Sequence, residues 1–252
     1  MNILNNKVAL VTGSSSGIGA AIARLFAQEG ARVVVHGRDT NAISSVQAQI
    51  ESGGGKAMCV AADVTKFDEI ESMRHQIEET FGSVDILVAN AGQNLIMPGP
   101  FEEISEEGWH ATINVNLTAT FLTIKSFLPG MKERKAGNII TISSAAARRP
   151  TSRSPIPYTA AKAGIQVMTQ IIAAQVGPYS IRANCITPET ILTEGNQQRI
   201  PDEQKQALLD MHPIKRLGTP EDVARAALFL ASDDAAWITG IIVDVAGGSV
   251  LV

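Results

Sequence analysis

A tyrosine and a lysine four residues apart are the residues best suited to acid–base chemistry in this chain. Tyr158 and Lys162 are separated by Thr-Ala-Ala. If this stretch is helical, both side chains lie on one face, because residues four apart are neighbours on a helix. A phenol has an ordinary pKa of about 10, and a neighbouring cation favours its ionised form. The pair therefore predicts a group that gives a proton to a ketone or takes one from an alcohol.

Two serines stand upstream of this pair, at the end of a short apolar run. Ser143 and Ser144 stand at the end of Asn138–Ser143, which is typical of a strand. In open parallel sheets, ligands bind at the carboxyl ends of the strands. A hydroxyl there can donate a hydrogen bond to a carbonyl oxygen as negative charge develops on it. The spacing Tyr-x-x-x-Lys is common by itself, so its interpretation as a catalytic pair depends largely on the serines at the end of the preceding strand.

A glycine-rich turn near the N-terminus is the second chemical signal. It spans Thr12–Gly19, between an apolar run at 8–12 and a helical pattern at 17–29. Glycines let the backbone turn tightly and approach a ligand closely, and a helix N-terminus attracts anions. The position after the first strand favours a pyrophosphate-binding loop over a plain strand-to-helix turn.

Short apolar runs alternate with helical patterns along almost the whole chain and must position these residues. We predict strands at 8–12, 32–36, 57–61, 85–90, 138–143, 181–186 and 241–245. The helices include long ones at 109–132 and 158–176. This alternation predicts an α/β fold: one Rossmann-type domain over residues 1–252, with a doubly wound parallel seven-stranded sheet and helices on both faces. A polar segment at 189–213 interrupts this alternation of strands and helices and is interpreted as a substrate-loop insertion.

The order of these motifs resembles the short-chain dehydrogenase/reductase family, in particular its 3-oxoacyl-ACP reductase-like members. The glycine spacing is Gly-x-x-x-Gly-x-Gly with Thr12 ahead of it, Asn90-Ala91-Gly92 ends the fourth strand, and Asn116 lies in Ile-Asn-Val-Asn-Leu. Segments at 216–224 and 244–248 are also similar to family sequence, so the resemblance covers nearly the whole chain.

The resemblance implies an oxidoreductase that transfers a hydride between a nicotinamide dinucleotide and a ketone or secondary alcohol. The implied catalytic residues are Asn116, Ser144, Tyr158 and Lys162, with Ser143 as the alternative serine and Asn116 holding a water that connects the lysine to solvent. The implied cofactor-binding residues are Gly13, Ser15, Ser16, Gly17, Ile18, Gly19, Arg38, Asp63, Val64, Asn90, Ala91, Gly92, Tyr158, Lys162, Pro188, Ile191 and Thr193.

The end of the second strand bears on which dinucleotide binds. NAD-binding folds place a carboxylate there for the ribose, but this chain has Gly37 followed by Arg38. A guanidinium binds a 2′-phosphate through charge-assisted hydrogen bonds. We therefore expect NADP(H), with NAD(H) as the alternative. Two observations oppose this: Asp39 is adjacent and can neutralise Arg38, and Ser16 stands where some NADP-dependent relatives have a basic residue.

One residue departs from the family pattern. Relatives usually have Pro-Gly after the sixth strand, whereas this chain has Pro188-Glu189. A side chain and a charge replace the glycine that lets the backbone approach the nicotinamide. We hypothesise that Glu189 points into the cleft mouth and disfavours anionic substrates.

Composition and charge limit the classes of partner and the cellular location that we expect for this protein. The net charge is −4 and no basic stripe is present, which argues against nucleic-acid binding. No apolar run approaches the ~20 residues that span a bilayer, and no targeting signal is visible. Cys59 and Cys185 lie in predicted strands and suggest buried thiols in a reducing, cytoplasmic compartment. The histidines lack metal-ligand spacing, so no metal site is expected.

The expected partners are small carbonyl or alcohol substrates, with an acyl thioester as a further option, and further copies of the chain. Family resemblance implies a homotetramer packed through the two long helices. The main alternative from another functional class is an NAD(P)-binding regulator or scaffold without turnover. A sugar-nucleotide epimerase is a second one, which the glycine spacing disfavours.

Overall fold

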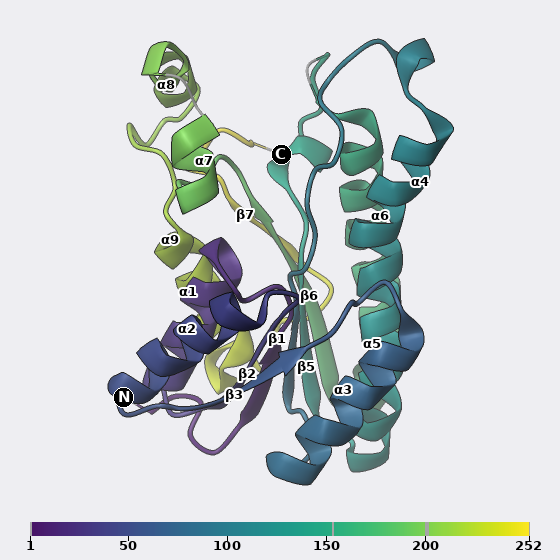
Figure 1. Ribbon diagram of the computed structural model, residues 1–252, viewed down its shortest axis with the longest axis vertical. Coiled ribbons are helices and arrows are strands. Elements are labelled where there is room, and N and C mark those ends of the chain that lie inside the picture. The colour runs from purple at the N-terminus through teal and green to yellow at the C-terminus, as the bar shows by residue number, and fades with distance from the viewer. Residues whose placement is uncertain (1, 153, 200–201, 252) are drawn as a thin grey trace.

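Seven parallel strands form one sheet, as the sequence predicted, and the structure gives their order as β3-β2-β1-β4-β5-β6-β7 (Figure 1). The computed structural model describes residues 2–152, 154–199 and 202–251, so residues 200 and 201 of the predicted 189–213 insertion lie outside the described part. The strands are β1 (Val8–Val11), β2 (Arg32–Gly37), β3 (Lys56–Ala61), β4 (Ile86–Ala89), β5 (Gly137–Ile142), β6 (Ile181–Pro188) and β7 (Ile242–Val245).

Two helical layers cover the sheet, and Figure 1 shows the sheet edge-on between them. Helices α1 (Gly17–Gln28), α2 (Thr40–Ser52) and α9 (Pro220–Ala231) cover one face, and α3 (Phe67–Thr80), α5 (Ala119–Arg134) and α6 (Ile156–Val176) cover the other. Alternate strand residues enter different cores: Val33 and Val35 pack with Phe26 of α1, whereas Val34 packs in the opposite layer. The doubly wound arrangement is therefore confirmed.

The chain order reverses beside β1, which pairs with β2 on one side and β4 on the other. Connections leave the two strands toward opposite faces, so a crevice forms at their carboxyl ends. The glycine turn follows β1 and Asn90 follows β4. The topology alone therefore brings the two motifs to the same place.

The structure refines two predicted segments. The long helix predicted at 109–132 consists of α4 (Glu106–Ile113), a π-helical turn at Asn114–Thr118 and α5. The predicted irregular segment contains α7 (Glu194–Arg199) and α8 (Asp202–Asp210), whose polar sequences hide their helical periodicity. Among the described residues, no helix combines the length and apolar character needed to cross a membrane.

The two cysteines do not share one environment. Cys185 in β6 is a buried thiol, as expected, but Cys59 in β3 is only half-buried. The prediction of two buried thiols is therefore wrong for Cys59. Its strand lies at the edge of the sheet, where a single layer of neighbours covers the side chain.

Candidate active site

The glycine turn is held in a fixed shape at the carboxyl end of β1. Gly13 and Gly17 have φ values of 65° and 54°, in the left-handed region that favours glycine. The Asn90 side-chain amide donates to the carbonyls of Thr12 (2.9 Å) and Gly13 (3.1 Å). A Cβ added at Gly13 would lie 2.9 Å from the Ala91 backbone, and one at Gly19 would overlap the Gly13 carbonyl. The turn therefore leaves no space for side chains on its inner side.

A cavity of about 240 Å³ lies against this turn, between the ends of β2, β3 and β4. The glycines and small serines of the turn and the adjacent N-terminus of α1 suit a dinucleotide phosphate there. The cavity brings together most of the predicted cofactor-binding residues, namely Gly13, Ser15, Ser16, Arg38, Asp63, Val64, Asn90, Ala91 and Gly92. It is also lined by His36, Gly37, Ala62, Thr65, Gln93 and Val115, which the sequence analysis did not assign to the cofactor.

The other predicted cofactor residues are not in the lining of this cavity, and Ile191 lines a separate one beside β7. Thr193 reaches the glycine turn, since a Cβ added at Gly17 would lie 3.1 Å from its methyl group. Pro188 ends β6 beside Val245, and buried Ile191 forms an isolated bridge with Gly218. The Ile18 side chain packs against the core instead, so only its backbone is available at the helix N-terminus.

Asp63 is tied into a local turn. One of its carboxylate oxygens accepts hydrogen bonds from the Thr65 backbone (3.0 Å) and hydroxyl (2.7 Å). The backbone hydrogen bond from Thr65 is the main reason that the pKa of Asp63 is lowered, and Arg38 contributes to the same direction. The carboxylate is therefore ionised at the cavity wall.

The two serines after β5 have different surroundings. Ser143 is buried; its hydroxyl donates to the Lys162 carbonyl at 2.7 Å and accepts from Gln166 at 3.0 Å. Ser144 is half-buried, and its side chain is hydrogen-bonded to Tyr158. Only Ser144 therefore meets the phenol, while Ser143 joins β5 to α6.

Lys162 and Tyr158 share one face of α6, as their spacing predicted. The lysine ammonium lies 5.6 Å from the centre of the Tyr158 ring and donates to the Ile142 carbonyl at 2.9 Å. Burial lowers the pKa of Lys162 to about 8. Burial also raises the pKa of Tyr158, the Ser144 hydrogen bond opposes the rise, and the charge of Glu189 adds to it.

The net shift of the phenol pKa is therefore upward, against the expectation of an acidified phenol, because burial outweighs the influences that favour the ionised form. A charge costs free energy in a poorly solvated position, so burial favours the neutral form of both side chains. This cost depends on the elements packed around the pair, which the four-residue spacing does not reveal.

Asn116, in the π-helical turn, lies near the Lys162 ammonium. It is fully buried, and its amide nitrogen donates to the carbonyls of Gln93 and Thr112, both at 2.8 Å. Its amide oxygen is buried without a hydrogen-bond partner among the described residues. A Cβ added at Gly92 would lie 2.5 Å from this oxygen and 3.3 Å from the Lys162 ammonium. Both polar groups therefore border the small space beside Gly92.

Comparison with known proteins decides the family. A family model described as enoyl-(acyl carrier protein) reductase matches residues 13–249. The chain belongs to the short-chain dehydrogenase/reductase family. The match runs from the glycine turn to the segment after β7, so it contains nearly all of the glycine-turn, asparagine, serine, tyrosine and lysine motifs.

Members of this family with stated activities are similar over their whole length. Glucose 1-dehydrogenase 2 of Bacillus subtilis is 40% identical over 98% of this chain and 96% of its own. A 7α-hydroxysteroid dehydrogenase in complex with NADH and 7-oxo glycochenodeoxycholic acid has a TM-score of 0.93 and 35% identity, covering 98% of this chain and 95% of its own. A 3-oxoacyl-[acyl-carrier protein] reductase with bound NAD from Brucella melitensis has a TM-score of 0.89 and 33% identity, covering 100% and 94%.

This short-chain dehydrogenase/reductase is an NAD(P)-dependent oxidoreductase acting on alcohol and carbonyl groups. The prediction of an enzyme is confirmed, and the alternative of a scaffold without turnover is set aside.

Proposed function

We propose that the enzyme interconverts ketones and secondary alcohols with NADP(H), using Ser144, Tyr158, Lys162 and Asn116. One observation carries the proposal: the Ser144 hydroxyl, the Tyr158 phenol and the Lys162 ammonium meet at the carboxyl end of β5. The bound dinucleotide supplies or accepts the hydride. The protein residues hold the carbonyl and move the proton.

Each side chain has a role that its surroundings support. Tyr158 is neutral because its pKa is raised, so it donates a proton to the oxygen of a ketone undergoing reduction. Ser144 donates a hydrogen bond to the same oxygen as negative charge develops there. Lys162 stabilises the resulting phenolate, since its positively charged ammonium lies 5.6 Å from the centre of the Tyr158 ring.

Asn116 completes the route by which the phenol regains its proton. Its amide oxygen has no partner in the described residues and faces the space beside Gly92 that Lys162 also borders. A buried acceptor of this kind is normally satisfied by water. We propose that this oxygen holds a water that passes protons between Lys162 and solvent.

The surroundings of Arg38 support a preference for NADP(H). Gly37 carries no carboxylate, and a Cβ added there would lie 2.9 Å from Ile43 and 3.1 Å from Ser15. Asp39 caps α2 by accepting hydrogen bonds from two backbone N–H groups of that helix. One carboxylate oxygen of Asp39 is therefore engaged in the helix cap, while Arg38 is exposed at the cavity and suits a 2′-phosphate.

Replacing Arg38 by glutamine tests this preference. We expect the ratio of kcat/KM for NADPH to that for NADH to fall about tenfold or more, because charge-assisted hydrogen bonds to the phosphate are lost. Steady-state kinetics with both cofactors measure the ratio. The matched control is Arg225→Gln on the exposed face of α9. A wild-type enzyme that prefers NADH, or an unchanged ratio in Arg38→Gln, would contradict the assignment.

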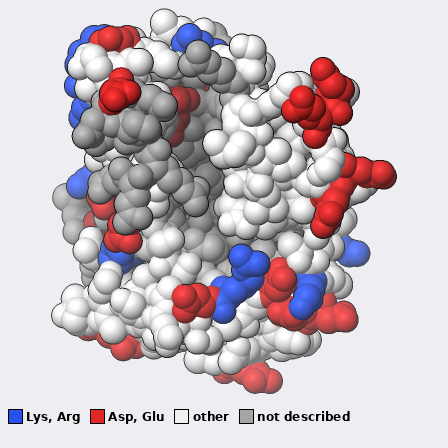
Figure 2. Space-filling view, turned by 45° about the horizontal axis from the view of Figure 1, so that its top comes forward, with Lys and Arg blue, Asp and Glu red and all other residues white. Residues whose placement is uncertain are grey.

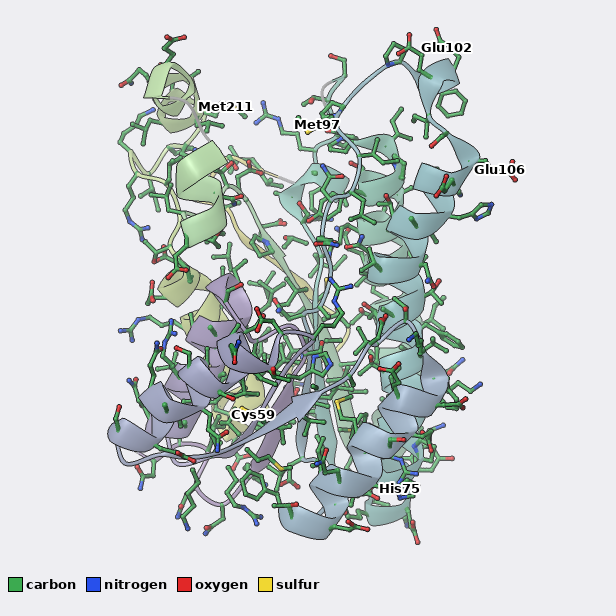
Figure 3. All side chains as sticks on the ribbon, viewed as in Figure 1. Cys59, His75, Met97, Glu102, Glu106 and Met211 are labelled. Carbon is green, nitrogen blue, oxygen red and sulfur yellow. The ribbon has the colours of Figure 1, made fainter. Side chains whose placement is uncertain are left out.

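We propose a small, partly apolar and uncharged or cationic carbonyl compound as the substrate. Apolar side chains are exposed at the carboxyl end of the sheet, including Met97 (81%) and Met211 (44%), and Figure 3 shows both at this end. Figure 2 turns this end toward the viewer and shows acidic side chains along one rim. Glu102 and Glu103 come before α4, Glu106 and Glu107 are in its first turn, and Figure 3 shows Glu102 and Glu106 at this end. An acidic rim disfavours an acidic carrier protein as the donor of an acyl thioester.

Glu189 contributes a further negative charge near the phenol. It is half-buried, accepts a hydrogen bond from the Thr190 hydroxyl at 3.0 Å and raises the Tyr158 pKa. We expect Glu189→Gly and Glu189→Gln each to raise kcat/KM for an anionic ketone about fivefold relative to a neutral ketone of the same size, because a repulsive charge is removed. Parallel assays with the two ketones measure the ratio. The charge hypothesis fails if the substrate profile is the same in wild type and both variants.

We propose that the enzyme is a cytoplasmic homotetramer that packs through α5 and α6. A groove of about 1040 Å³ runs along these helices and is bordered by apolar residues. Three of them have about half of their surface exposed, namely Phe121, Val167 and Ile171. An apolar area of this kind usually belongs to an interface. Sedimentation velocity that finds a monomer would contradict this part of the proposal.

A further inference from the structure

His36 is buried in the wall of the cofactor cavity, at the end of β2. Only 2% of its surface is exposed. The Gly13 backbone N–H donates to its Nδ1 at 3.0 Å, and its Nε2 lies 3.1 Å from the Ala62 carbonyl. Because Nδ1 accepts a hydrogen bond, the ring proton is on Nε2, which donates to Ala62. The ring is thereby fixed in one tautomer and one orientation.

The backbone of His36 is bonded to the glycine turn as well. The Ser14 N–H donates to the His36 carbonyl at 2.8 Å, and the His36 N–H donates to the Ser14 hydroxyl at 2.9 Å. That hydroxyl in turn donates to the Val11 carbonyl at 2.7 Å. The backbone bonds attach β2 to Ser14, and the ring is the acceptor of the Gly13 N–H among the described residues.

The two ring hydrogen bonds join opposite sides of the cavity. Gly13 belongs to the turn that borders the proposed phosphate position, whereas Ala62 precedes Asp63 and Val64 on the side proposed for adenine. Gly13 lies in the left-handed region at φ 65°, and among the described residues its N–H donates to this ring. Without the ring, the N–H would lose its partner and the turn would lose its link to β3.

The ring is neutral under ordinary conditions. Burial is the main cause that lowers the pKa of His36 to about 4, with the Ala62 hydrogen bond and the Asp63 charge acting in the opposite direction. A neutral imidazole keeps Nδ1 free to accept from Gly13. The ring lies in the cavity wall beside the turn, and no contact joins it to Tyr158, Ser144 or Lys162 among those described.

We propose that His36 is a positioning residue that presets the glycine turn and the adenine side of the cavity, and so determines dinucleotide affinity without acting in the hydride or proton transfer. This inference rests on the proposed placement of the dinucleotide in the cavity. It assigns a function to a side chain that neither contacts the reacting groups nor belongs to the motifs found in the sequence.

Three substitutions separate the two ring hydrogen bonds. His36→Asn places an amide oxygen near the position of Nδ1 and can still accept from Gly13. His36→Gln can still donate toward Ala62. His36→Phe keeps a ring of similar size and makes neither bond. We expect the Kd for NADPH or NADH to rise about tenfold or more in His36→Phe, with partial recovery in His36→Asn.

The measurement is a titration of each purified variant with both dinucleotides, followed by kinetics at saturating cofactor. We expect KM for the cofactor to follow Kd, while kcat stays within about twofold of wild type. A purely structural role would lower the melting temperature of all variants without this separation of KM from kcat. Equal affinity of His36→Phe and wild type, or a loss confined to kcat, would overturn the inference.

A Ser16→Trp variant tests the cavity independently, because Ser16 is an exposed lining residue of the turn. If Ser16→Trp binds dinucleotide like wild type, the proposed placement fails. If Ser16→Trp loses binding and His36→Phe does not, the placement holds and only the role of His36 is wrong.

Discussion

Replacing Tyr158 by phenylalanine is expected to lower kcat at least ~100-fold, the usual contribution of a positioned acid or base. The substitution removes one oxygen, so the hydrogen bond with Ser144 and the proton transfer are lost together. The ring and its contact with the Lys162 ammonium remain. We therefore expect the Kd for the dinucleotide to change much less than kcat.

Stopped-flow measurement of the first turnover, with NADPH absorbance as the signal, separates the chemical step from product release. Tyr179→Phe is the matched control, because Tyr179 is the other tyrosine of the chain and packs against Lys132. Wild-type turnover by Tyr158→Phe would remove the acid–base assignment. Equal losses in both variants would point to a general defect of the fold.

Replacing Lys162 by methionine is expected to abolish most activity and, at the same time, to make the protein more stable. Methionine fills a similar volume without a charge. Activity falls because the phenolate loses its stabilising cation, and we expect a loss of at least ~100-fold in kcat. Stability rises because the buried ammonium costs folding free energy in wild type.

The pKa of Lys162 sets the pH range of this effect. Its value is lowered from 10.5 to about 8, so the unfolded chain holds the proton more tightly than the folded protein. The destabilising contribution of Lys162 therefore diminishes as the pH rises above about 8, and below that pH its full cost is present. At pH 7 we expect Lys162→Met to exceed wild type in free energy of unfolding by ~1–3 kcal/mol, allowing for the lost hydrogen bond to Ile142.

Urea unfolding at pH 7 and pH 9.5 tests both parts of this expectation. The stability difference between Lys162→Met and wild type should shrink at the higher pH, while the exposed control Lys56→Met should show no such change. A variant less stable than wild type at pH 7, or a difference that is the same at both pH values, would show that the ammonium carries no burial cost.

Local patterns were sufficient to predict the sheet and most of the cofactor cavity. The glycine turn could be predicted because a strand precedes it and a helix follows it in the sequence. The asparagine at the end of β4 could be placed beside the turn because the carboxyl ends of parallel strands lie at one edge of the sheet. The same holds for Tyr158 and Lys162, because their contact follows from one helix. Ser144 could be preferred over Ser143 only by family resemblance, and the structure gives the physical difference: Ser143 is bonded into α6.

Features that depend on distant contacts were not predictable. The partners of His36 are 23 and 26 residues away, so nothing beside it in the sequence indicates a role. The direction of the Tyr158 pKa shift depends on burial by several elements. The π-helical turn around Asn116 has no marker in the apolar spacing, since both flanking helices continue in nearly the same direction.

The π-helical turn at Asn114–Thr118 separates the angular phase of α4 from that of α5. A π turn accommodates an additional residue, whereas each residue of an α-helix advances the side chain by about 100°. A continuous α-helix over the same residues would orient the Asn116 amide differently relative to α5. The direction of this amide toward Lys162 is thus set separately from the outward face of α5, on which subunit assembly is proposed to depend.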